Sequence, residues 1–164
     1  MKTSGAAGPE EDLMIFGATR YPPPDRYERT TMSDWIDAFY ADVEGMRLHE
    51  TLDHFAPDGE LVFANNPPAI GHAAISELLT GFWSAIAGMR HDWRHRWTVD
   101  EGTSVLEARV HYTTPGGAEV VVPCVTIIDR GPSGLINSLR LHLDAAPVFA
   151  AIGAESNAPR EVAR

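Results

Sequence analysis

A two-residue periodicity that begins after Gly88 is the feature that most constrains the fold of this chain. Four stretches carry it, namely residues 89–99, 105–114, 118–129 and 135–144. Because successive side chains of a β-strand point to opposite faces, each stretch predicts a strand. Two loops separate the last three stretches and are typical of hairpins, Pro115-Gly116-Gly117 and Gly131-Pro132-Ser133-Gly134. We therefore expect four long antiparallel strands.

The first half of the chain has helical periodicity instead. The first helix is expected to follow an N-cap at Ser33, and a second short helix to cover residues 48–55. The turn sequence Ala56-Pro57-Asp58-Gly59 ends the second helix, and residues 60–64 form a short strand. A third helix follows Gly71, with an apolar stripe made of Ile75, Leu78, Leu79, Phe82 and Ile86. Helices followed by a strand meander predict an α+β domain with the helices on one face of the sheet.

The length of 164 residues suits one domain. Residues 1–31 hold scattered charges and Pro22-Pro23-Pro24 without a sustained period, so we expect a mostly disordered arm there. The domain is expected to span residues 32–153, and residues 154–164 to form a short frayed tail.

The formal net charge of −10 makes nucleic acid and membrane surfaces poor partners, because an acidic protein repels phosphate backbones and anionic headgroups. No signal-peptide pattern opens the sequence, and no apolar run approaches the roughly 20 residues of a membrane span. A cytoplasmic location is therefore expected. The single cysteine, Cys124, stands in an apolar run and is expected to be a buried, unreactive thiol.

Metal and cofactor chemistry have no support in the sequence. His91 and His95 are four residues apart on an expected strand, which places their side chains about 13 Å apart, too far to bind one ion together. The His-Glu-x-x-His pattern of zinc enzymes, the glycine-rich nucleotide patterns and the Gly-x-Ser-x-Gly pattern of hydrolases are all missing from the sequence. We therefore expect no metal and no cofactor.

Polar and titratable side chains gather on one face of two expected strands. These are Glu107, Arg109 and His111 on the middle strand, and Arg140, His142 and Asp144 on the last strand. Two interpretations are open, because these faces can meet solvent while the opposite faces form the core, or they can line an interior pocket while the apolar faces form a subunit interface. The preceding strand mixes aromatic and imidazole side chains on one face, at His91, Trp93, His95 and Trp97, and this favours the pocket.

Acid/base chemistry is what these polar residues can perform. A carboxylate at Asp144, held between an apolar pocket and a neighbouring arginine, can serve as a general base. His111 can act as its acid partner near neutral pH. Alternatively, Asp144 caps the end of its strand or pairs with Arg140.

Two segments of the chain resemble SnoaL-like proteins of the nuclear transport factor 2-like superfamily. They are Phe63-Ala64-Asn65-Asn66-Pro67-Pro68-Ala69-Ile70-Gly71 with the helix after it, and Arg140-Leu141-His142-Leu143-Asp144-Ala145-Ala146-Pro147-Val148-Phe149. His91, at the opening of the long strand, also fits. The resemblance covers roughly residues 32–153 and implies a cone-shaped, curved antiparallel sheet wrapped around the N-terminal helices. It also implies a pocket between sheet and helices and a dimer through the outer sheet face, which favours polar strand faces that turn inward.

Two enzyme branches of this superfamily can be compared with the chain. Limonene-epoxide-hydrolase-like proteins use an Asn before a Pro, an Arg on the middle strand and an Asp on the last strand, and Asn65, Arg109 and Asp144 match. Phe63 stands where that branch has a Tyr, and His111 where it has its first Asp. SnoaL-like polyketide cyclases use an Asp on the last strand for an intramolecular aldol closure, and Asp144 is similar in position.

The residues and the resemblance together predict a cofactor-independent enzyme that acts by acid/base catalysis on a small apolar oxygenated molecule, such as a polyketide or terpenoid. Asp144 would be the base, His111 the acid, and Arg109 would orient Asp144. The substrate-binding side chains would be Asn65, Phe63, Tyr40, His91, Trp93, Trp97 and His142. The alternatives are a non-catalytic small-molecule-binding module and a dimerisation domain of the same fold. A homodimer is expected.

Overall fold

The structure is a computed structural model that describes residues 15–16, 19–20 and 34–156 of the chain. Its elements, in chain order, are β1 (Ile15–Phe16), β2 (Thr19–Arg20), α1 (Asp34–Glu44), α2 (Leu48–Asp53), β3 (Phe55–Phe63), β4 (Ala69–Ile70), α3 (Gly71–Trp83), β5 (Gly88–Thr98), β6 (Thr103–Thr113), β7 (Glu119–Arg130), β8 (Ile136–Leu143) and α4 (Ala146–Ser156). β1 and β2 pair antiparallel. The rest of the expected N-terminal arm, and residues 157–164 of the expected tail, lie outside the described residues. Within the described ranges, no helix is long and apolar enough to cross a membrane.

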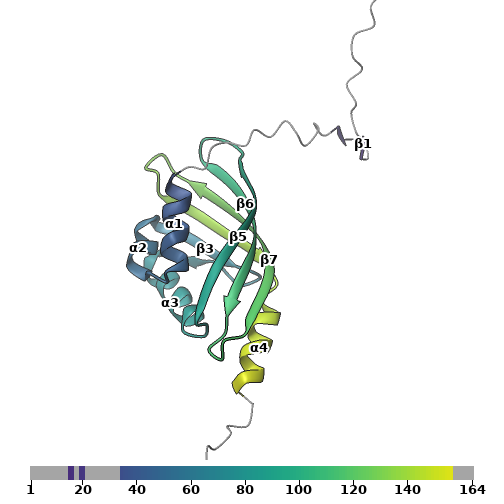
Figure 1. Ribbon diagram of the computed structural model, residues 1–164. Coiled ribbons are helices and arrows are strands. Elements are labelled where there is room, and N and C mark those ends of the chain that lie inside the picture. Colours follow the sequence, from purple (N-terminus) through teal and green to yellow (C-terminus); the bar gives the residue numbers. More distant parts are fainter. Residues whose placement is uncertain (1–14, 17–18, 21–33, 157–164) are drawn as a thin grey trace, which may run out of the picture.

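The expected helices and long strands are present close to their predicted bounds. α1, α2 and α3 lie together against one face of a curved, unclosed six-stranded sheet, so the chain has the predicted α+β class (Figure 1). The strand order is β4-β3-β8-β7-β6-β5. β5 to β8 form the antiparallel meander, but β3 pairs with β8 in parallel. The sheet is therefore mixed and not wholly antiparallel as expected, because β8, the last strand of the meander, lies beside β3 and runs in the same direction.

The turn expected after the second helix is built into β3 as a bulge. Between the pairs Phe55–Ile136 and Glu60–Ser138, β3 advances five residues while β8 advances two. Gly59 lies within this bulge and against β8, where an added Cβ would stand 2.7 Å from the Ile136 carbonyl oxygen. Only glycine fits so close to a neighbouring backbone, so the turn residues also set the spacing of the two strands.

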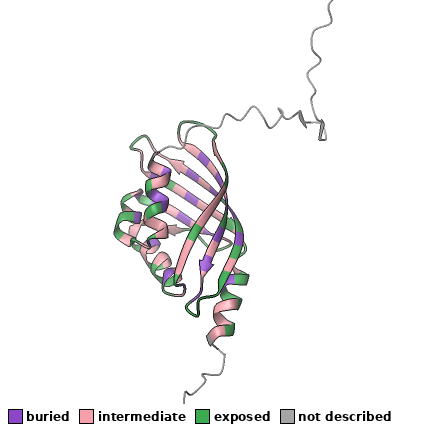
Figure 2. Ribbon diagram, in the orientation of Figure 1, coloured by how far each residue is buried: buried purple, intermediate pink, exposed green. Residues whose placement is uncertain are grey.

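The apolar strand faces pack against the helices, and the polar faces point away from them. Leu139 is 2% exposed and Val110 is 1% exposed, whereas Arg109 and His142 are exposed. Buried residues alternate with more exposed ones along the strands of the sheet (Figure 2). The expectation that the polar faces turn inward is therefore wrong. The helices present apolar stripes to the sheet, and charged groups packed against them would lose their water without gaining partners.

An extra residue in β5 exchanges the two faces of that strand. The pairs Trp93–Ala108 and His95–Glu107 flank this residue, which is Arg94. Such a β-bulge shifts the alternation by one position. His91 and Trp93 therefore face the helices, while His95 and Trp97 stack on each other on the outer face. The prediction that these four side chains share one face is therefore wrong, because the bulge places His91 and Trp93 on one face and His95 and Trp97 on the other.

The helix α4 was not expected from the sequence. An Asx turn starts it, in which the Asp144 Oδ1 accepts a hydrogen bond of 2.9 Å from the Ala146 backbone N–H. Val148 on its first turn is fully buried beside β6 and β7. Near its end, Glu155 accepts hydrogen bonds from the hairpin between β6 and β7, including one of 2.8 Å from the Gly116 N–H. The helix is thus attached at both ends.

Candidate functional site

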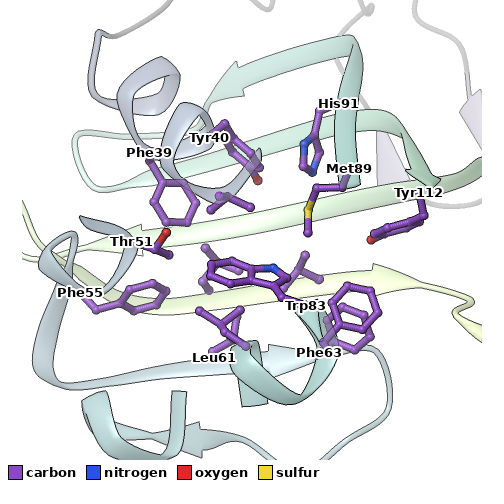
Figure 3. A pocket seen from close by; sticks show the side chains of 15 residues that line it. Phe39, Tyr40, Thr51, Phe55, Leu61, Phe63, Trp83, Met89, His91 and Tyr112 are labelled. Carbon is purple, nitrogen blue, oxygen red and sulfur yellow. The ribbon is translucent and has the colours of Figure 1, made fainter. Parts of the chain in front are cut away.

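A cavity of about 50 Å³ lies between the helices and the apolar face of the sheet. Its walls come from α1, α2 and α3 and from β3, β5, β6 and β8 (Figure 3). The residues that line it are Phe39, Tyr40, Val43, Thr51, Phe55, Leu61, Phe63, Leu79, Phe82, Trp83, Met89, His91, Tyr112, Leu139 and Leu141. The wall is mostly aromatic and aliphatic. Because small-molecule sites usually measure roughly 300–1,000 Å³, a ligand of more than a few atoms requires wall side chains to move.

The only imidazole among the lining residues belongs to His91, near the start of β5. Its side chain is 6% exposed, and Figure 3 shows the ring reaching into the cavity between Tyr40 and Met89. The Trp93 ring stacks on it, with centroids 5.1 Å apart and planes 12° from parallel. Tyr40 meets it edge-on at 4.7 Å. Aromatic contacts on both sides therefore fix the orientation of the imidazole.

Glu44, the last residue of α1, holds both the main chain and the side chain of His91. Its Oε1 atom accepts a hydrogen bond of 2.7 Å from the His91 backbone N–H and lies 2.9 Å from His91 Nδ1. Burial opposes ionisation of this carboxyl, but the side-chain and backbone hydrogen bonds from His91 outweigh it and hold the pKa of Glu44 below its ordinary value. The site therefore pairs a carboxylate with an imidazole at the edge of an apolar cavity.

Two hydroxyl groups in the wall have no hydrogen-bond partner within the described residues. They belong to Tyr40 and Thr51, and both atoms are buried. Burial raises the pKa of Tyr40 well above its ordinary range, and the nearby Thr126 side chain opposes this only in part, without reaching hydrogen-bond geometry. Burial also raises the pKa of Tyr112. These phenols keep their protons and can donate to an oxygen atom, and a buried donor without a partner favours a ligand that supplies one.

The sequence-predicted binding residues are divided between the cavity and the surface. Phe63, Tyr40 and His91 line the cavity. Trp93 lies directly behind the wall, with its ring 4.5 Å from Tyr40. Asn65 is exposed in the turn after β3. Trp97 and His142 lie on the outer sheet face, beyond the β5 bulge and on β8 respectively.

The predicted catalytic residues of β6 lie on the outer sheet face as well. Arg109 is exposed. His111 Nδ1 lies 2.7 Å from the guanidinium of Arg90 and 3.1 Å from the carboxylate of Glu119. Neither Arg109 nor His111 reaches the cavity wall, because the buried residues of β6 are the even-numbered ones, and Tyr112 is the one of them that lines the cavity.

Asp144 lies just after β8, where its side chain is exposed and bonded to the start of α4. Within the described residues, no hydrogen bond or ion pair joins it to His111 or Arg109. Its position fits the capping alternative that the sequence left open, except that the capped element is a helix.

Sequence reasoning missed three polar residues of the site, namely Glu44, Thr51 and Tyr112. A signal existed for Glu44, because it follows Tyr40 by four residues and so lies on the same face of α1. Thr51 gave no signal beyond its place between the apolar positions of α2. Tyr112 lies on the apolar face of β6, opposite His111, and the sequence interpretation in which polar faces line the pocket turns this apolar face outward.

The sequence model of the SnoaL-like domain family matches residues 36–138. The chain belongs to this family. The matched stretch contains the cavity residues from Tyr40 to Tyr112 and the Glu44–His91 pair, and it ends before Asp144. A comparison with curated protein sequences finds no match.

Solved structures of similar fold agree with a SnoaL-like domain. TerC, co-crystallised with polyporic acid, has 21% sequence identity and a TM-score of 0.61, over 72% of this chain and 95% of that chain. An NTF2-like protein from Burkholderia pseudomallei K96243 has 18% identity and a TM-score of 0.63, over 71% and 93%. A protein of ketosteroid isomerase-like fold from Catenulispora acidiphila, in complex with trimethylamine, has 21% identity and a TM-score of 0.65, over 75% and 95%. At these sequence identities, the structural similarity shows the fold alone. The chemistry of this SnoaL-like domain has to be inferred from the residues of its site.

Proposed function

We propose that this SnoaL-like domain is an enzyme that works without a cofactor, by acid/base catalysis on a small apolar oxygenated molecule. The observation that carries the proposal is the imidazole of His91, which enters a mostly apolar cavity with its Nδ1 atom on the carboxylate of Glu44. Histidine is the side chain that most readily exchanges protons near neutral pH. A titratable group in a mostly apolar wall, oriented by a carboxylate, is a typical general base.

The neighbouring hydroxyl groups support a substrate that contains oxygen. Tyr40 and Thr51 carry buried hydroxyls without partners among the described residues, and Tyr40 contacts the His91 ring. A carbonyl or hydroxyl oxygen that accepts from Tyr40 would be held close to the imidazole. His91 could then take a proton from one atom of the substrate and return it to another, which leaves both side chains unchanged at the end. Cyclisation and isomerisation need such a transfer, and hydrolysis needs it from a water molecule.

The base role that the sequence suggested for Asp144 therefore passes to His91 in this proposal. The substrate is of polyketide or terpenoid type in its polarity, because the rest of the wall offers aromatic and aliphatic contacts. Organic molecules bound to two proteins of similar fold, polyporic acid with TerC and trimethylamine with the Catenulispora protein, support a small-molecule site.

The small volume of the cavity favours a second candidate, a binding module that holds a ligand without turning it over. A site of about 50 Å³ fits few atoms unless partly exposed wall side chains such as Phe82 and Met89 move. Methionine adapts its shape readily, so the cavity can enlarge on the Met89 side. The two candidates differ in whether the bound molecule is chemically changed.

An experiment with matched histidine variants separates them. The purified protein, His91→Gln and His95→Gln are incubated with a metabolite extract, and mass spectrometry follows which molecules are retained or consumed. We expect a molecule that the wild type and His95→Gln consume at similar rates and that His91→Gln consumes about 10²–10⁴ times more slowly. His95 is the control because it also contacts a carboxylate and a tryptophan ring, but on the outer face. Equal rates for His91→Gln would contradict the base role of His91, and retention without consumption would identify the binding module.

The outer face of β7 supports a homodimer. Val121 and Val125 are 41% and 37% exposed, and Pro123 between them is exposed as well. An apolar row in the middle of a sheet face is a candidate for burial against a second copy. A double substitution, Val121→Glu with Val125→Glu, should convert a dimer of the wild type into a monomer in light scattering. A monomeric wild type at micromolar concentration would refute the dimer.

A further inference from the structure

Glu44 occupies a position on α1 that disfavours a carboxylate. It is the last residue of the helix, where the backbone carbonyl dipoles place partial negative charge, and the last turn holds no basic residue. A negative side chain there opposes the local rule for helix ends. Residues that break a local rule are expected where a site requires them. Among the described residues, His91 is the hydrogen-bond partner of this carboxylate, and Arg90 acts on it through its charge alone.

We propose that Glu44 is a positioning residue, which holds His91 in the tautomer with hydrogen on Nδ1 and so leaves the lone pair of Nε2 for the cavity. This inference rests on the proposed function of His91 as the base. It assigns the reacting atom and the residue that prepares it.

The geometry supports the assignment through a single oxygen atom. Glu44 Oε1 lies 2.7 Å from the His91 backbone nitrogen, which always carries hydrogen, and 2.9 Å from Nδ1. The backbone bond fixes the oxygen in place, and an ionised carboxylate only accepts hydrogen bonds. Nδ1 must therefore be the donor. A neutral imidazole has one N–H, so Nε2 is left as the acceptor, and no hydrogen bond reaches Nε2 from the described residues.

The chain contains a matched pair outside the cavity. His95 Nδ1 lies 2.7 Å from the carboxylate of Glu107, and its ring stacks on Trp97 with planes 11° from parallel. His91 has the same arrangement with Glu44 and Trp93, at 2.9 Å and 12°. The two pairs differ in exposure, since the His95 side chain is 60% exposed and the His91 side chain 6%. Glu107 variants are therefore controls for Glu44 variants.

The test is nuclear magnetic resonance of the full-length protein labelled with ¹⁵N-histidine, at a pH where the imidazoles are neutral. Long-range ¹H–¹⁵N correlations tell a protonated ring nitrogen from an unprotonated one, and His91→Gln and His95→Gln assign the two signals. We expect hydrogen on Nδ1 and none on Nε2 for His91 in the wild type. Glu44→Leu should convert His91 to a mixture of tautomers and leave His95 unchanged, while Glu107→Leu should affect His95 alone.

Glu44→Gln is the conservative variant, because its amide oxygen can still accept both hydrogen bonds. It should retain the Nδ1–H tautomer that Glu44→Leu loses, and it keeps the test decisive if Glu44→Leu unfolds. With a substrate in hand, Glu44→Leu should lower kcat with little change in KM, and Glu44→Gln should recover part of the loss.

Two results would overturn the inference: hydrogen on Nε2 of His91 in the wild type, or an unchanged His91 tautomer in folded Glu44→Leu. A failure of the proposed function looks different. In that case the tautomers respond as expected, but His91→Gln consumes the substrate at the wild-type rate.

Discussion

Two glycines, Gly59 in the β3 bulge and Gly81 in α3, should change the stability of the protein in opposite directions when they are replaced by alanine. At Gly59 an added Cβ would lie 2.7 Å from the Ile136 carbonyl oxygen and 3.0 Å from that of Ala56. Both obstacles are backbone atoms of the sheet, so neither can rotate away, and β3 has to separate from β8. At Gly81, on the exposed side of α3, an added Cβ meets nothing within 4 Å.

The magnitudes follow from these contacts. Overpacking of this kind destabilises the folded state by about 1–3 kcal/mol. Alanine also lowers the entropy of the unfolded chain, which stabilises the folded state by about 0.4–1 kcal/mol. The net effect of Gly59→Ala should be a destabilisation of about 1–2 kcal/mol. Gly81→Ala should stabilise by about 0.5–1 kcal/mol, because alanine favours the helix interior. A folded body of roughly 120 residues has an unfolding entropy of about 0.25 kcal/mol/K, so the expected shifts in Tm are about −4 to −8 °C for Gly59→Ala and about +2 to +4 °C for Gly81→Ala.

Thermal melts followed by circular dichroism, with urea unfolding as a second measurement, test both values. Gly59→Ala at or above the wild-type Tm would refute the close approach of β3 and β8. Since β3 carries Leu61 and Phe63 into the cavity wall, a destabilised Gly59→Ala should also retain less ligand. Gly81→Ala should retain as much as the wild type.

Two further predictions concern stability at acid pH and the bulge in β5. Burial opposes ionisation of Asp42, but hydrogen bonds from His54 and Arg47 hold its pKa below the ordinary value. The ionised carboxylate therefore contributes its full stabilisation above the ordinary carboxyl pKa, and this stabilisation is lost as the pH falls below that value. Asp42→Asn should therefore lower Tm at pH 7 and reduce the further loss of Tm between about pH 5 and pH 3, and equal acid sensitivity of the two proteins would contradict this. Deletion of Arg94 removes the extra residue of β5, so the inward and outward side chains on one side of the deletion have to exchange faces. We expect the deletion variant to lose cooperative unfolding, whereas Arg94→Ala should melt within a few degrees of the wild type. A deletion variant with wild-type Tm would show that the bulge is not needed.

The sequence predicts the elements of this fold well and the orientation of its sheet poorly. Alternation and turn chemistry are local, so the strands from β5 to β8 were found within one or two residues of their bounds. Which face of a strand is buried depends on what covers it. Leu139 and Arg140 alternate equally well in either orientation, and only the apolar helices opposite Leu139 decide between them.

Two elements escaped the sequence for different local reasons. Arg94 forms a bulge without glycine or proline, and nothing in a run of alternating residues marks which one is extra. The helix α4 contains four alanines among its eleven residues, and Pro147 stands in its first turn. A helix tolerates proline at that position, but in the sequence it looks like a break in the pattern. The Glu44–His91 contact joins residues 47 apart in the chain and exists only once α1 packs on β5.

The role of Asp144 can be decided by two substitutions that a base and a cap answer differently. As the residue that starts α4, Asp144 accepts a hydrogen bond from the Ala146 N–H, and asparagine can accept the same bond. Asp144→Asn should therefore keep Tm within about 1 °C of the wild type and keep full activity, whereas Asp144→Ala should lose about 0.5–2 kcal/mol of stability through the lost cap. A general base would give a different result, because asparagine has no carboxylate and would be as inactive as alanine. If Asp144→Asn is folded but about 10²-fold or more slower on a substrate that the wild type consumes, the base belongs at the end of β8 and not at His91.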